Sequence, residues 1–155
     1  MNSLLKDRLG RGFAAGILGW LPTFVFSMAI DLGFHLLKLR FMDFAGILAF
    51  DHKPHGFWEA LFSEAIVLAQ MGALGMLFTL IIAIIARPHL LLKGGLYGGF
   101  TWFITYAMAD LFKVTGIHGT VDFPTAFFNL IASVLWGTAL GWALLWLNRK
   151  YDVQN

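Results

Sequence analysis

Four polar residues in otherwise apolar sequence are the first candidates for chemistry in this chain. Each stands near one end of a different long apolar run, and a histidine follows the first of them by about one helical turn. They are Asp31, Glu64, Asp110 and Asn129, with His35 as the histidine. Acidic groups inside a membrane are costly and normally face the interior of a helix bundle, where they line ion or proton pathways. These five residues are therefore our candidates for binding an ion or a proton.

Two arrangements of the three acids are consistent with the sequence. In the first, the carboxylates converge just beneath the outer face of the membrane, where closely held like charges favour a shared proton. In the second, each carboxylate is solvated near the lipid headgroups or paired with a nearby cation, namely Lys38, Arg40 or Lys113. Helical periodicity alone does not decide between them.

The histidines suggest a second kind of site, at the outer face. His52 and His55 have two residues between them, and with Asp51 or His118 they could ligate a divalent metal ion. Loop histidines are more often simply solvated, and a bis-histidine haem would need a second span histidine opposite His35. We therefore expect no cofactor. The sequence also contains no obvious Ser, His and acid trio, so we expect no catalytic residue.

The composition is that of a membrane protein. Of the 155 residues, 59% are hydrophobic and 13% are charged, and the mean hydropathy is +0.74, whereas soluble domains carry about 25% charged residues. Four apolar runs are each long enough for the roughly 20 residues of a membrane span, and they cover residues 12–37, 59–86, 90–112 and 125–147. The connector 38–58 contains an apolar stretch, 41–50, which is too short to span and should lie on the outer surface. We expect residues 1–155 to form one transmembrane domain.

The basic residues predict the orientation of the bundle. Seven Lys or Arg residues flank the spans on the side of the chain termini and four on the opposite side, and the richer side is normally cytoplasmic. We expect both termini inside, a tight cytoplasmic turn at Ala86-Arg87-Pro88, and a multi-pass location in the cell membrane. The first run is far longer than the apolar core of a signal peptide, so we expect it to remain. A net charge of +2 without a basic block argues against nucleic-acid binding.

Small residues recur at helical spacing and predict close helix packing. Glycines three or four residues apart let two membrane helices approach closely. The segment Gly94–Gly99 superimposes two such patterns, and the one through Gly95 shares a face with Tyr106 and Asp110. The predicted packing residues are Gly12, Gly16, Gly19, Gly95, Gly99, Gly137 and Gly141.

The two halves of the chain show internal similarity. The matched segments are 28–32 with 107–111, 11–20 with 93–102, and 73–75 with 139–141. Different gaps are needed for these matches, so chance is a serious alternative. A real duplication would give two tandem helical hairpins related by an axis along the membrane normal, with Asp31 and Asp110 as symmetry mates.

The second half also resembles a known family. The Gly-rich opening Gly94-Gly95-Leu96-Tyr97-Gly98, Trp102, and the helix with Gly137 and Gly141 are similar to the small four-span YqhR-type membrane proteins of Gram-positive bacteria. The function of that family is unknown. The resemblance implies four spans and a bacterial cell membrane, and it supplies no site residues.

The sequence therefore predicts an all-α, four-span bundle with both termini cytoplasmic and the lipid bilayer as its main partner. We expect a non-enzymatic protein, either a small transport, ion- or proton-binding unit or an accessory subunit of a membrane complex. Four helices barely enclose a pathway, so transport would require a homo-oligomer or a larger complex. The alternative is a membrane enzyme or redox subunit that acts on a lipid or quinone through the outer His and acidic residues.

Overall fold

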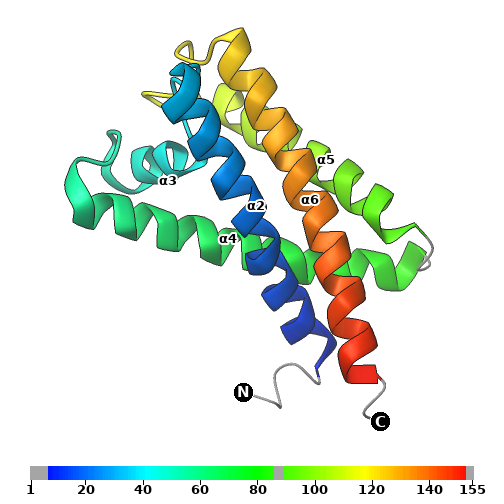
Figure 1. Ribbon diagram of the computed structural model, residues 1–155. Helices are drawn as coiled ribbons and strands as arrows, with labels where there is room; N and C mark the ends of the chain where they lie inside the picture. Colours follow the sequence, from blue (N-terminus) through cyan, green and yellow to red (C-terminus); the bar gives the residue numbers. More distant parts are fainter. Residues whose placement is uncertain (1–6, 86–88, 153–155) are drawn as a thin grey trace.

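A computed structural model describes residues 7–85 and 89–152, and the expectation of an all-α chain is confirmed. The helices are α2 (Arg8–Phe34), α3 (Phe41–Phe50), α4 (Gly56–Ile85), α5 (Leu90–Leu111) and α6 (Phe123–Asp152) (Figure 1). No strand occurs among the described residues. The predicted turn at Ala86-Arg87-Pro88 lies outside them. Helices α2, α4 and α6 are long and apolar enough to cross a membrane, which indicates a multi-pass membrane protein.

Helices α2 and α6 run side by side through the middle of the molecule, and the beginning of α2 lies at the same end as the end of α6 (Figure 1). Helix α4 packs against α2, and α5 packs along α6. Helices α4 and α5 lie near each other where α4 ends and α5 begins and separate along their lengths, with α3 at the wide end (Figure 1). They do not pack along each other, although they are consecutive in the chain.

Glycines form the contact between α2 and α4. A Cβ atom added to Gly16 would lie 2.1 Å from the carbonyl oxygen of Met71, and one added to Gly75 would lie 2.3 Å from that of Gly12. Real side chains do not come so close to a backbone. The two helices therefore touch backbone to backbone, as small-residue spacing allows in membrane helices.

The contact between α5 and α6 repeats this arrangement. Cβ atoms added to Gly94 and Gly98 would lie 2.1 and 2.0 Å from the carbonyl oxygens of Gly137 and Ser133. Gly95 and Gly99, the predicted packing residues, instead face side chains on α6, at 3.0 and 3.6 Å. The other two predicted glycines also approach backbone: Gly19 meets α6 at the amide nitrogen of Leu140, and Gly141 meets α5 at the carbonyl of Leu90.

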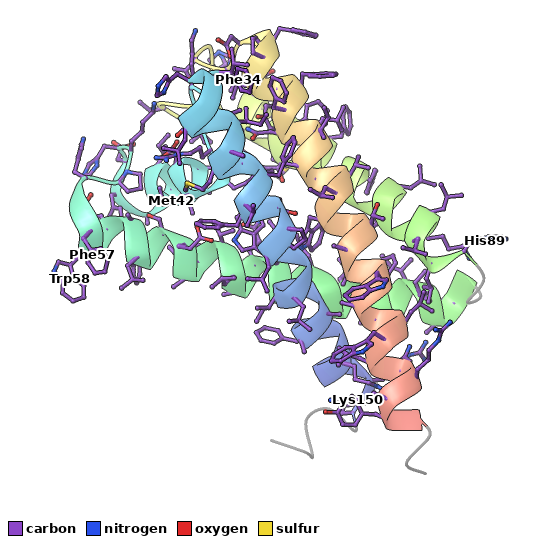
Figure 2. All side chains as sticks on the ribbon, viewed as in Figure 1. Phe34, Met42, Phe57, Trp58, His89 and Lys150 are labelled. Carbon is purple, nitrogen blue, oxygen red and sulfur yellow. The ribbon has the colours of Figure 1, made fainter. Side chains whose placement is uncertain are left out.

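The short helix α3 occupies the stretch that was expected to be too short to span. It packs against α4, and its Phe44 and Ile47 form a small apolar cluster with Ala109 of α5 and Ile117 of the following loop. At the far side of this region Phe57 and Trp58 project from the beginning of α4 (Figure 2), with exposed fractions of 70% and 77%. Exposed aromatic residues at the end of an apolar helix are typical of an interface with lipid headgroups.

Candidate functional site

A pocket of about 350 Å³ lies between α4 and α5. Its size falls within the range of about 300–1,000 Å³ typical of small-molecule sites. Residues of α3 close its wide end, and Trp20 of α2 and Trp136 of α6 contribute to its wall. Its polar lining residues are Thr23, Gln70, Thr101, Trp102, Thr105 and Ser133, with the tryptophans above, and none of its lining residues is acidic, basic or histidine.

Two side chains explain why α4 and α5 stay apart while α2 and α6 meet. On α2, Gly19 touches the backbone of α6, and Ala15, one turn earlier on the same face, is fully buried. On α5, Gly94 and Gly98 take the roles of Gly12 and Gly16. Counted from them, the residues that correspond to Ala15 and Gly19 are Tyr97 and Thr101. Because these side chains are larger than those of Ala15 and Gly19, α5 stays further from α4 than α2 does from α6. The space between α4 and α5 is the pocket.

Tyr97 acts as the spacer at the narrow end of this gap. Its ring packs against Phe78 of α4 with centroids 5.1 Å apart, and its hydroxyl donates a hydrogen bond to the carbonyl of Leu74 at 2.9 Å. A polar tip that bonds to the neighbouring backbone fixes the distance between the two helices at this point. The pocket is therefore a consequence of specific residues on α5.

The three indole N–H groups in the pocket wall lie beside polar groups of the protein. Trp20 donates its indole N–H to Glu64, and Trp136 donates to the carbonyl of Gly16 at 3.0 Å. The indole nitrogen of Trp102 is also buried, and its N–H lies beside the hydroxyl of Tyr106, against whose ring the indole packs.

A polar network lies behind Trp20, next to the pocket. The indole N–H donates to one carboxylate oxygen of Glu64, while the other oxygen is buried without a partner. Glu64, Ser27 and Arg40 line a second cavity of about 10 Å³, which is about the space that one water molecule needs. The hydroxyl of Ser27 is also buried and unpaired. Trp20 thus lies between the apolar pocket and the small cavity beside Glu64.

Arg40 forms ion pairs with two acidic residues of this region. Its guanidinium lies 3.2 Å from Asp31 and 3.3 Å from Asp43. The backbone N–H of Arg40 also donates to Asp43 at 2.7 Å, which caps the beginning of α3. Asp43 is only 5% exposed, so this cation is its necessary partner. Sequence reasoning considered Arg40 as a partner of the span acids but missed Asp43 and Trp20.

The structure does not bring the three predicted acids together. Asp31 pairs with Arg40, Glu64 with Trp20, and Asp110 with His118, whose Nδ1 lies 2.7 Å from its carboxylate. The side chain of Asp110 is 77% exposed. Arg40 interacts with both Asp31 and Glu64, whereas the partner of Asp110 is His118. A role of these acids in ion or proton binding stays a prediction.

The other predicted site residues are Asn129 and the histidines, and their contacts differ from one residue to the next. Asn129 is buried and donates to the carbonyl of Leu39 at 3.0 Å and to the hydroxyl of Tyr106 at 2.9 Å, which ties α6 to α5 and to the segment before α3. His35 is exposed and ends α2 in a left-handed conformation with φ of 51°. His52 and His55 lie together with Glu59, and neither Asp51 nor His118 belongs to that group.

The beginning of α6 is fixed by Asp122. One carboxylate oxygen accepts the backbone N–H of Thr125 at 3.1 Å, and the other lies 3.1 Å from the ammonium of Lys38. The hydrogen bonds from Thr125 lower the pKa of Asp122 to about 2, with a smaller contribution from Lys38. Asp122 therefore stays ionised at all ordinary pH values and caps the helix as an anion.

Comparisons of this chain with family models, curated proteins and solved structures give no match.

Proposed function

We propose that this membrane protein binds a membrane-soluble molecule in the pocket between α4 and α5. The molecule combines an apolar body with a carbonyl or hydroxyl oxygen, as an ester lipid or a prenyl quinone does. The observation that carries the proposal is an apolar pocket of about 350 Å³ whose few polar lining groups include the amide of Gln70 and the hydroxyl of Thr105.

The surroundings of the pocket define the class of ligand. Its walls are mainly Phe, Trp, Leu, Ile, Val, Met and Ala, and it lies beside α4, which is apolar enough to span a membrane. A molecule from the bilayer exchanges one apolar environment for another when it enters such a pocket, so these walls favour a membrane-soluble ligand. The lining offers hydroxyl, amide and indole groups and no titratable acid or base, so we propose binding and not catalysis.

We propose four spans, with α5 as the third of them in chain order and both termini in the cytoplasm. A helix of 22 residues is about 33 Å long, which matches the hydrocarbon core of roughly 30 Å. The two glycine contacts support tandem hairpins, because Gly12 and Gly16 face α4 as Gly94 and Gly98 face α6. The resemblance to the YqhR-type proteins suggests a bacterial cell membrane.

The proposal is tested by fluorescence, because three of the six tryptophans border the pocket. A decyl-substituted benzoquinone added to the protein in detergent should quench this fluorescence in a saturable manner. Thr105→Phe fills the pocket from α5 and should weaken the saturable quenching at least tenfold. The matched control is Ala107→Phe, which adds the same ring at an exposed position of α5 outside the pocket lining. Equal quenching of the two variants would contradict the proposal.

A second candidate function is proton binding at Glu64. It is favoured by the unpaired carboxylate oxygen and the unpaired hydroxyl of Ser27, which border the same small cavity. If Glu64 conducts, proton flux into proteoliposomes, followed with a trapped pH-sensitive dye, should fall at least tenfold in Glu64→Gln. Asp110→Asn should leave it unchanged, because Asp110 lies outside this region. Equal flux in Glu64→Gln and the unaltered protein rejects this candidate.

A further inference from the structure

The turn between α3 and α4 gathers three metal-binding side chains that the pocket does not use. Among the described residues, His52, His55 and Glu59 are the one group of three or more His, Asp or Glu residues whose ligand atoms all lie within 4.8 Å of one another. The two imidazole rings stack with centroids 4.7 Å apart, and Nδ1 of His52 lies 3.8 Å from Oε2 of Glu59. We infer that this group is a binding site for a divalent transition metal, namely Zn²⁺.

The donor set suits this ion. Two imidazole nitrogens and one carboxylate oxygen are common zinc ligands, with bond lengths of about 2.0–2.2 Å, and in tetrahedral coordination two such ligand atoms are about 3.4 Å apart. One ligand atom from each of the three side chains lies within 4.8 Å of the others, so small side-chain rotations bring the ligands to a metal. Ca²⁺ and Mg²⁺ prefer oxygen ligands alone. A three-ligand set also leaves a fourth position open to water.

The backbone holds these side chains in place before a metal binds. The backbone N–H of His55 donates to Oε2 of Glu59 at 2.7 Å, which fixes the carboxylate at the first turn of α4. Pro54, between the histidines, packs on α3, since a Cβ atom added to Gly46 would lie 2.4 Å from its Cγ. The turn is thereby anchored to both helices, and little conformational entropy is lost when the ligands close on an ion.

A neighbouring carbonyl orients the first imidazole. Nδ1 of His52 lies 2.8 Å from the carbonyl oxygen of Lys53. A proton on Nδ1 would donate to that oxygen and leave Nε2 of the ring as the metal ligand. Hydrogen bonds of this kind from the second imidazole nitrogen to a backbone carbonyl are usual at metal sites, where they fix the tautomer and the ring orientation.

The site is tested by calorimetric titration of the full-length protein in detergent with Zn²⁺ after treatment with a chelator. We expect one Zn²⁺ per chain, and a rise in Kd of tenfold or more in His52→Gln, His55→Gln and Glu59→Gln. Glu59→Gln retains an acceptor oxygen for the backbone of His55, so the turn should keep its shape. The matched control is His118→Gln, an exposed histidine of the other outer loop.

Co²⁺ provides a second readout, because its visible absorption reports the coordination geometry. Intense bands of a tetrahedral complex should appear with the unaltered protein and with His118→Gln, and they should be absent in Glu59→Gln. The inference is overturned if the protein binds no Zn²⁺, or if the three turn variants bind it as tightly as the His118 variant. Unchanged thermal melting of the metal-free variants will confirm that any loss reflects the ligands and not the fold.

Discussion

Gly98→Ala is expected to lower the free energy of unfolding by about 3 kcal/mol, the upper end of the usual cost of overpacking. The added methyl group would lie 2.0 Å from the carbonyl oxygen of Ser133 and 2.8 Å from its carbon. Both atoms belong to the backbone of α6, so no side chain can rotate away. The two helices would have to separate, and the contacts between α5 and α6 would be lost along their length.

Gly99→Ala is the matched control for this prediction. The nearest atom to its added methyl group would be a side-chain carbon of Val134 at 3.6 Å, an ordinary contact. Its free energy of unfolding should stay within about 0.5 kcal/mol of the unaltered protein. Unfolding by SDS in mixed micelles, followed by circular dichroism, compares the two variants. Similar stabilities would show that α5 does not meet α6 through Gly98.

Arg40→Gln is expected to destabilise the protein by about 3 kcal/mol, the low end for the loss of one member of a buried ion pair. Asp43 would remain buried with its charge uncompensated, and Asp31 would lose its partner. The estimate is at the low end because the side chain of Arg40 is 29% exposed. The capping hydrogen bond from the backbone of residue 40 to Asp43 should survive.

The control for the Arg40 variant is Lys38→Gln, two residues away. Lys38 also forms an ion pair, with Asp122, but its side chain is 62% exposed, and exposed pairs contribute little to stability. The same SDS titration should therefore give a much smaller change. The double variant Arg40→Gln/Asp43→Asn should recover part of the loss, because the buried charge is then removed. No recovery would mean that the ion pair is not the source of the effect.

The helices could be predicted from the sequence because their signals are local. A run of apolar residues long enough to span identifies a helix wherever it packs, and the stretch 41–50 coincides with α3. The pocket could not be predicted in this way. It depends on which helix faces which, and on Tyr97 and Thr101 of α5 holding the places that Ala15 and Gly19 hold on α2.

The symmetry expected for the acids shows a second limit of the sequence. Similar residues were matched, so Asp31 was paired with Asp110 and Gly75 with Gly141. The packing instead gives Gly137 the place of Gly75. Counted from the packing glycines Gly12 and Gly94, the counterpart of Asp31 is Lys113. A shift of three residues displaces a side chain by about 4.5 Å along the helix axis, so Asp110 is not the structural counterpart of Asp31, and it pairs with His118 instead.

Two residues of the proposed sites had signals that sequence reasoning did not use. Trp102 stands in an apolar run, and a buried indole N–H needs an acceptor, which Tyr106 supplies four residues later. Glu59 follows His55 by four residues, a spacing that places two side chains on one helix face. Neither signal is specific without the fold, because the same spacings occur throughout membrane helices.

The occupancy of the pocket is most directly measured by native mass spectrometry of the protein released from its own membrane. We predict a bound apolar molecule, whose mass will distinguish an ester lipid from a quinone. It should be retained in Ala107→Phe and lost in Thr105→Phe, which fills the space between α4 and α5. Equal retention of the molecule by both variants, or a protein that carries none, would contradict ligand binding in this pocket.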